Sequence, residues 1–317
     1  MAIPTIYGTV MNLLRSLLPL AAVALAARAW AQAPVYGVLE SYFIANRTTP
    51  GAIHRLSWGE FNWRALPNVK LTGSFTQMPD NWTLDEVCAA VDYKSSMLRV
   101  GRMRTAFGFN NWSEVFYNGF NHVPLVRMSP LTDGMRLTRD DSGLEFTTYL
   151  GGLQIQVAAV DTSLGDGQIT PDNVDTGTVR LQGESGRFVL GLDAMKRLRH
   201  EPGVYGFDLR YTAPYVTSRV EYFNGDGSPS SQGYYADVQY RLPGHPRTSI
   251  VGMTEMFDKD KTGKPTFLHT VGVRQFFTRH LAVNLNYGWG SRLDNLPAIR
   301  MQGLDNWTLR AMFQIQF

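Results

Sequence analysis

The chain has 317 residues, of which 44% are hydrophobic and 12% aromatic, and its formal net charge is +3. This nearly balanced charge does not indicate a nucleic-acid partner, and a single cysteine excludes an intrachain disulfide. No uninterrupted apolar run reaches the roughly 18 residues that a membrane-spanning helix needs. The aromatic content and the 30 glycines are more typical of strands and tight turns than of helices.

Residues 1–31 have the features of a secretory signal peptide. Arg15 precedes the apolar segment 16–27, and Ala29 and Ala31 form an Ala-x-Ala cleavage site. The alternative interpretation of the apolar segment is a short buried helix. We expect cleavage after Ala31.

The mature chain would then be a single domain, residues 32–317, and either Met1 or Met11 is the start of the precursor. An exported chain of this size without disulfides needs another source of stability. A closed ladder of strands would supply it.

Sixteen segments of alternating apolar and polar residues follow the signal peptide, and fourteen strands is the alternative count. Each segment is about 9–14 residues long, the length of a tilted strand that crosses a hydrocarbon layer. The predicted strands are 34–45, 55–63, 68–78, 84–93, 96–105, 142–150, 153–161, 177–185, 187–196, 203–212, 215–224, 232–241, 247–257, 266–276, 280–289 and 304–317.

The alternation gives each strand one apolar and one polar face. In the last segment, Leu309 and Phe313 fall on one side and Arg310 and Gln314 on the other. In these segments the charged residues are confined to one of the two strand faces. This fits a barrel with lipid outside and water inside, because a lipid-facing Lys or Arg near the bilayer midplane costs about 2–4 kcal/mol. In the segment 99–107 the polar residues switch from one strand face to the other, which predicts a bulge there.

The connections decide between a soluble sandwich and a membrane barrel. Along the chain they are alternately short and long, which would place short turns at one end and long polar loops at the other. A soluble sandwich has no reason to sort its connections in this way. The sequence therefore predicts an all-β fold, a transmembrane antiparallel β-barrel.

Three tryptophans are predicted to lie at the membrane interface. Trp82 and Trp307 each follow an Asp-Asn pair where a long loop enters a strand, and Trp289 belongs to the outward set of its strand. Tryptophan is enriched at the boundary between lipid and water.

The connection 106–141 is far longer than the others, and a loop of this length in a compact domain is usually functional. We expect it to be the third external loop. It either folds into the lumen or lies across the mouth. Its candidate site residues are Glu114, His122, Arg127, Asp133, Arg136, Arg139, Asp140 and Asp141.

The barrel wall is predicted to offer nearly equal numbers of inward cations and acids. The cations are Lys70, Arg99, Arg180, Arg187, Arg210, Arg219, Arg241, Arg274 and Arg310. The acids are Glu86, Asp92, Glu145, Glu184, Asp193, Asp208, Glu221 and Asp237. Loop acids facing wall arginines would set a transverse field with weak or mildly anionic selectivity. The alternative is that these charges pair across strands and fill the barrel.

Sixteen strands, an enlarged third loop and the terminal Phe317 resemble the bacterial porins over the whole mature chain. The stretch 98–109, LRVGRMRTAFGF, resembles the phosphate-selective and related substrate-selective group, although the chain has no evident lysine cluster. The resemblance implies a third loop that narrows the lumen, a homotrimer, and an outer-membrane location among the lipids of a bacterial cell. It also implies that Phe317 is a signal for the barrel-assembly machinery.

The sequence thus favours a passive channel for small hydrophilic solutes or ions. A non-conducting structural or adhesive barrel is the main alternative. An outer-membrane barrel enzyme would need Ser-His-acid or Asp-His groups at the outer rim, and neither a Gly-x-Ser-x-Gly motif nor a clustered His–Ser pair occurs. We therefore expect no enzymatic activity and no cofactor. We also expect no metal, because the histidines lack ligand spacing.

Overall fold

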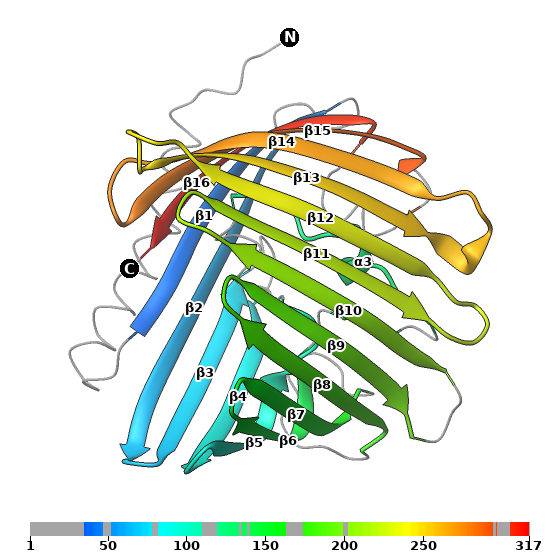
Figure 1. The fold of residues 1–317 in the computed structure, drawn as a ribbon. Helices are drawn as coiled ribbons and strands as arrows, with labels where there is room; N and C mark the ends of the chain where they lie inside the picture. The colour runs from blue at the N-terminus through cyan, green and yellow to red at the C-terminus, as the bar shows by residue number, and fades with distance from the viewer. Residues whose placement is uncertain are drawn as a thin grey trace.

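The computed structural model describes residues 35–46, 52–77, 82–109, 119–132, 135–137, 140–162, 174–198, 202–293, 296 and 305–316. These residues form a closed barrel of sixteen antiparallel strands (Figure 1). Each strand pairs with its neighbours in chain order, and β1 closes the barrel on β16. No helix within these residues has the length and hydropathy needed to span a membrane. The signal-peptide prediction lies outside the described residues.

All sixteen predicted strands are confirmed, with ends that shift by a few residues. The strands are β1 (Val35–Asn46), β2 (Ala52–Leu66), β3 (Val69–Gln77), β4 (Trp82–Tyr93), β5 (Ser96–Arg104), β6 (Asp140–Leu150), β7 (Leu153–Asp161), β8 (Thr176–Ser185), β9 (Phe188–Arg197), β10 (Gly203–Thr212), β11 (Val216–Gly225), β12 (Gln232–Arg241), β13 (Thr248–Asp258), β14 (Thr266–Phe276), β15 (Leu281–Ser291) and β16 (Trp307–Gln316). The largest difference is in β2, whose ladder with β1 begins at Ala52 and whose ladder with β3 continues to Leu66.

The connections are sorted between the two ends of the barrel as predicted. Both termini of the strand ladder and all seven short turns lie at one end, toward the left of Figure 1, which we call the short-turn end. The longer connections lie at the opposite, long-loop end. The short turns are 67–68, 94–95, 151–152, 186–187, 213–215, 242–247 and 277–280.

The outer face of the barrel is apolar and the inner face is mostly polar. On β15, Leu285 and Tyr287 are 49% and 45% exposed, whereas the alternate residues Asn284 and Asn286 are buried inside. On β16, Phe313 is exposed and Arg310 is buried. Lipid would therefore solvate the outward surface better than water would.

The bulge predicted in the fifth strand occurs instead in its neighbour, β4. Ser74 of β3 pairs with Glu86 and the next residue pairs with Leu84, so Asp85 is the extra residue of β4. The pairing of β5 with β4 and with β6 shows no register shift. Irregularity in β5 is limited to Gly101, which has a φ of +122° and where a Cβ would lie 2.4 Å from the Val87 carbonyl oxygen.

Candidate functional site

The third long connection folds into the barrel. Its described parts are residues 105–109, 119–132 and 135–137, and they include the short helix α3 (Leu125–Met128). Figure 1 shows α3 inside the barrel behind β11 and β12. We call these described parts the infolded loop.

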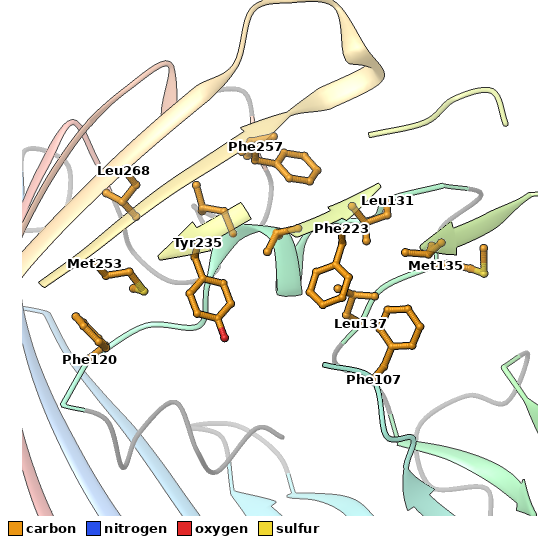
Figure 2. Close-up of a cluster of buried hydrophobic side chains, with 14 of the residues drawn as sticks. Phe107, Phe120, Leu131, Met135, Leu137, Phe223, Tyr235, Met253, Phe257 and Leu268 are labelled. Carbon is orange, nitrogen blue, oxygen red and sulfur yellow. The ribbon is translucent and has the colours of Figure 1, made fainter. Parts of the chain in front are cut away.

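An apolar cluster fixes the infolded loop to the inner wall (Figure 2). Apolar loop side chains pack against inward side chains of β9 to β14. The fully or almost fully buried members include Phe107, Phe120, Leu125, Leu131 and Met135 from the loop and Phe223, Tyr235, Met253, Phe257 and Leu268 from the wall. These wall side chains would face water without the loop, so burying both surfaces stabilises the infolded position.

Wall carboxylates accept hydrogen bonds from the start of the loop. The Gly108 N–H donates to Oδ1 of Asp193 at 3.0 Å, and the Phe109 N–H donates to Oε1 of Glu221 at 2.5 Å. The guanidinium groups of Arg180 and Arg210 lie over the Phe109 ring, at 5.5 and 5.3 Å from its centroid. These contacts place the loop across the inner face of β8 to β11.

Arg127 of α3 makes the main ion pair between loop and wall. Its Nε and Nη2 donate to the two carboxylate oxygens of Glu221 at 2.9 and 2.7 Å, and its Nη1 donates to the Phe107 carbonyl oxygen at 2.8 Å. Burial opposes the charged form of Arg127, but the Glu221 carboxylate more than offsets this, so the pKa of the guanidinium lies above its ordinary value. Glu221 thus connects α3 to the start of the loop.

Glu255 of β13 forms the second carboxylate anchor. Its Oε1 lies 2.6 Å from Nε2 of His122, and its Oε2 accepts the Leu125 N–H at 2.6 Å. Both side chains of the pair are almost completely buried. The pair fixes the segment that leads into α3.

Hydrogen bonds from an amide, a guanidinium and a backbone N–H fix the two remaining parts of the loop. Asn286 of β15 donates through Nδ2 to the Gly119 carbonyl oxygen at 3.0 Å, and Arg310 of β16 donates to the carbonyl oxygen of Asn121. At the long-loop end, the Ser231 N–H donates to the Leu131 carbonyl oxygen at 2.6 Å. The infolded loop is thus bonded to the wall along its described length.

Three of the deep wall arginines pair with acids on neighbouring strands. Arg99 reaches Glu145 at 2.8 Å, Arg180 reaches Asp193 at 2.8 Å, and Arg219 reaches Asp237 at 2.6 Å. In each case the two residues are direct register partners. Cross-strand pairing of the wall charges, the alternative expectation, is confirmed for these three arginines.

The barrel has counterparts among solved structures, although neither a protein-family profile nor a curated protein sequence matches the chain. Salmonella typhi OmpF in complex with daunomycin is 11% identical, and the match covers 90% of this chain and 97% of that chain with a TM-score of 0.63. A mutant of Rh. blastica porin is 10% identical over 90% and 100% of the two chains, also with a TM-score of 0.63. The chain has the porin fold.

A third similar structure is OmpT of Vibrio cholerae, described as an outer membrane protein in trimer form. It is 12% identical over 90% of this chain and 99% of that chain, with a TM-score of 0.59. Every one of these identities is low, so the comparisons establish the porin fold and not the activity.

The structure places two of the predicted loop acids in a strand. β6 begins at Asp140, so Asp140 and Asp141 are strand residues, and Nε of Arg104 donates to Oδ1 of Asp140 at 3.3 Å. Of the two loop cations among the described residues, Arg136 is exposed and Arg127 faces a wall acid. Arg127 lies against Glu221 because a buried charge without a partner is strongly destabilising. Glu114 and Asp133 lie outside the described residues, so the pairing of these loop acids with wall arginines stays a prediction.

The other predicted site residues are scattered over the barrel. Glu114, Asp133, Arg139 and Phe317 lie outside the described residues. Arg136 is exposed, Arg210 is half-buried, and Arg241 is exposed near the short-turn end. Arg274 is buried and donates a hydrogen bond to Gln314 at 2.9 Å. Trp82, Trp289 and Trp307 are 54%, 40% and 43% exposed near the long-loop end.

Glu255 is the anchor that sequence reasoning missed. It lies on the same face of β13 as Met253 and Phe257, so the inward face of this strand is unusually apolar and gives a poor alternation signal. The sequence signal that could have identified this anchor is a carboxylate between two apolar residues on the inward face of a strand. Among the described residues, no cluster of three or more His, Cys, Asp or Glu could hold a metal ion.

Proposed function

We propose that the protein is an outer-membrane channel through which small hydrophilic solutes or ions diffuse passively, with weak or mildly anionic selectivity. The observation that carries this proposal is a closed barrel, apolar outside and polar inside, with a segment fixed against one side of its interior. A loop in this position narrows a lumen and selects what passes. The porin fold supports the location in the bacterial outer membrane.

The contacts of the infolded loop suggest where the passage runs. The hydrogen bonds described above connect the loop to β9, β11, β13, β15 and β16. The opposite wall, formed by β2 to β4, would then be the free side of the passage. Its inward residues include the half-buried Asn62 and Thr72, whose side chains hydrogen-bond each other at 2.9 Å.

The exposed wall charges next to the short turns include the cations Arg64, Lys70 and Arg241 and the acids Asp92 and Glu184, and this small excess of cations supports the mild preference for anions. Arg64 and Lys70 are directly opposed in the ladder of β2 and β3, and both are exposed, as is Arg241. Like charges directly opposite each other are destabilising, so their pairing has no structural benefit. Within the described residues these cations form no ion pair, whereas acids neutralise the deeper arginines Arg99, Arg127, Arg180 and Arg219.

The test of the channel is the current carried by purified protein in planar bilayers, together with the reversal potential in a salt gradient. We expect discrete conductance steps and a reversal potential whose sign indicates that anions permeate more readily than cations. The variant Arg64→Gln/Lys70→Gln/Arg241→Gln should keep the conductance steps but lose the anion preference, because the unpaired charges are gone.

The matched control keeps the charges, as Arg64→Lys/Lys70→Arg/Arg241→Lys, and should retain the preference. An unchanged reversal potential in the glutamine variant would refute this source of selectivity. Folded protein that inserts without conducting would refute the channel itself.

Such a result would favour the second candidate, a non-conducting structural barrel. The observation in its favour is that paired charges and an apolar cluster fill much of the described interior. We expect no catalytic activity, and assays of phospholipid and peptide hydrolysis test this expectation. Inside the barrel, the buried His122 is bonded to Glu255, away from the outer rim where a barrel enzyme would need it.

The oligomeric state and the constriction residues are also proposals. We propose a homotrimer, supported by the trimer form of the similar OmpT structure. We also propose that the infolded loop, anchored by the buried His122 and Arg127 and carrying the exposed Arg136, forms the narrowest part of the lumen. The half-buried wall cations Arg99 and Arg210 would line it, and the buried Arg310 would hold the loop against the wall.

A further inference from the structure

The short turns of the barrel contain cations and no acids. Their charged residues are Lys94, Arg187, Arg247 and Arg279, and none of the seven turns contains Asp or Glu. The eight connections at the long-loop end are nearly balanced, with ten Lys or Arg and eleven Asp or Glu. The two ends of the barrel therefore differ in sign of charge, although the whole chain is close to neutral.

Each turn cation lies beside a large, exposed aromatic side chain. Tyr93 is 69% exposed, Phe188 is 51% exposed and Phe277 is 53% exposed. The Nζ of Lys94 lies 5.3 Å from the centroid of the Tyr93 ring. Such aromatic rings favour the boundary between hydrocarbon and headgroups, so they place the neighbouring cations at headgroup level.

The other three turn cations have the same placement. Arg187 directly precedes Phe188, and Nη1 of Arg247 donates to the Phe277 carbonyl oxygen at 3.0 Å. Arg279 is in the same turn as Phe277, and its Nε lies 2.8 Å from Nε2 of His280. All four cations are exposed, and none forms an ion pair with a carboxylate in the described part of the chain.

The four cations are distributed around the barrel instead of converging on one point. They occupy the turns β4–β5, β8–β9, β12–β13 and β14–β15, which the strand order separates around the circumference. A single bound anion would require the positive charges to converge. A ring of separated charges at one level fits a partner that surrounds the barrel, which is a lipid leaflet.

We propose that this ring of turn cations binds the headgroups of anionic phospholipids in the leaflet at the short-turn end. Arg and Lys donate charge-assisted hydrogen bonds to phosphate oxygens, and cations near a negatively charged leaflet are attracted to it. The inference rests on the proposed membrane location and goes beyond channel function. It predicts that the short-turn end selects its lipid neighbours by charge.

The test measures lipid selectivity in reconstituted bilayers of phosphatidylcholine. Trace spin-labelled phosphatidylglycerol or phosphatidylcholine is added, and the motionally restricted fraction of each label gives its relative association with the barrel. We expect phosphatidylglycerol to be preferred about two- to threefold at low salt, and less so in high salt because exposed charges are screened. Lys94→Gln/Arg187→Gln/Arg247→Gln/Arg279→Gln should bring the ratio close to one.

The matched control removes four exposed cations near the long-loop end, as Lys196→Gln/Lys259→Gln/Lys264→Gln/Arg292→Gln. It should keep most of the preference. An equal loss in both variants would show that net charge alone attracts the lipid and would overturn the proposal. No preference in the unchanged protein would also overturn it.

Conductance measured on the same preparations separates this inference from the channel proposal. Conduction without lipid preference refutes the lipid ring alone, and lipid preference without conduction refutes the channel alone. If the turn variant changes ion selectivity while its lipid preference stays intact, the cations act on solutes at the pore mouth and the lipid ring is wrong. Heat-modifiable gel mobility, in which folded barrels migrate faster than unfolded chains, checks that every variant is folded.

Discussion

Buried charges in this barrel are stable because each has a specific partner. Glu221 receives two hydrogen bonds from Arg127 and one from the Phe109 N–H, so one carboxylate fixes two parts of the infolded loop. Leaving either member of such a pair alone in a buried site costs about 3–5 kcal/mol. At the residue scale, Arg127 is therefore a loop anchor and not a free charge at the constriction.

Replacing Arg127 with methionine should lower the free energy of unfolding by about 3–5 kcal/mol, because Glu221 would remain buried without its partner. It should also make single-channel currents larger or noisier, because the loop is less firmly fixed. Urea unfolding in lipid vesicles and bilayer recordings measure the two effects.

Two further variants make this test specific. The double variant Arg127→Met/Glu221→Gln removes both charges and should recover part of the lost stability. Arg136→Gln, at an exposed position, should change stability by no more than about 0.5 kcal/mol. If Arg127→Met and Arg136→Gln behave alike in both assays, Arg127 is not an anchor.

At the scale of the strand, alternation separates lipid-facing from lumen-facing residues, and the exceptions have a structural cause. The inward face of β13 carries Met253 and Phe257 because the infolded loop covers it. On β15 the loop contacts Asn286 through a hydrogen bond, and the inward face stays polar. The covering segment, and not the membrane, therefore decides how polar an inward face is.

Arginine should be tolerated on the inner face and not on the outer one. Leu285→Arg, near the middle of β15 and facing outward, should destabilise the barrel by about 2–4 kcal/mol. Gln239→Arg, at a half-buried inward position of β12, should cost far less because water or a neighbouring acid can solvate the charge. Unfolding titrations in vesicles compare the two, and equal costs would contradict the assignment of faces.

At the scale of the whole molecule, closure of β1 on β16 removes the sheet edges that would otherwise pair with other chains. The last described residues, Ile315 and Gln316, pair with Leu39 and Val38 of β1. Strand β16 therefore completes the barrel.

We propose Phe317 as an assembly signal, so its deletion should lower the amount of folded protein in the outer membrane several-fold. The measurement is the heat-modifiable fraction in isolated membranes. Phe317→Tyr, which keeps a terminal aromatic ring, should assemble normally. Wild-type levels of the deletion variant would contradict a role in assembly.

The sequence by itself determined the barrel. A two-residue period is a local property, so segments such as 281–289 and 304–317 revealed strands and their faces without knowledge of any partner. The alternation of short and long connections then indicated two distinct ends and an even number of strands. The length of the third connection also marked it as the functional candidate.

Only the tertiary structure decided which side chains meet inside the barrel. Arg127 and Glu221 are 94 residues apart, and His122 and Glu255 are 133 apart. Their contacts depend on strand register and on the path of a loop that has no period of its own. A non-periodic segment finds its place through the packing and charge pairing of the closed interior, and these exist only once the chain has folded.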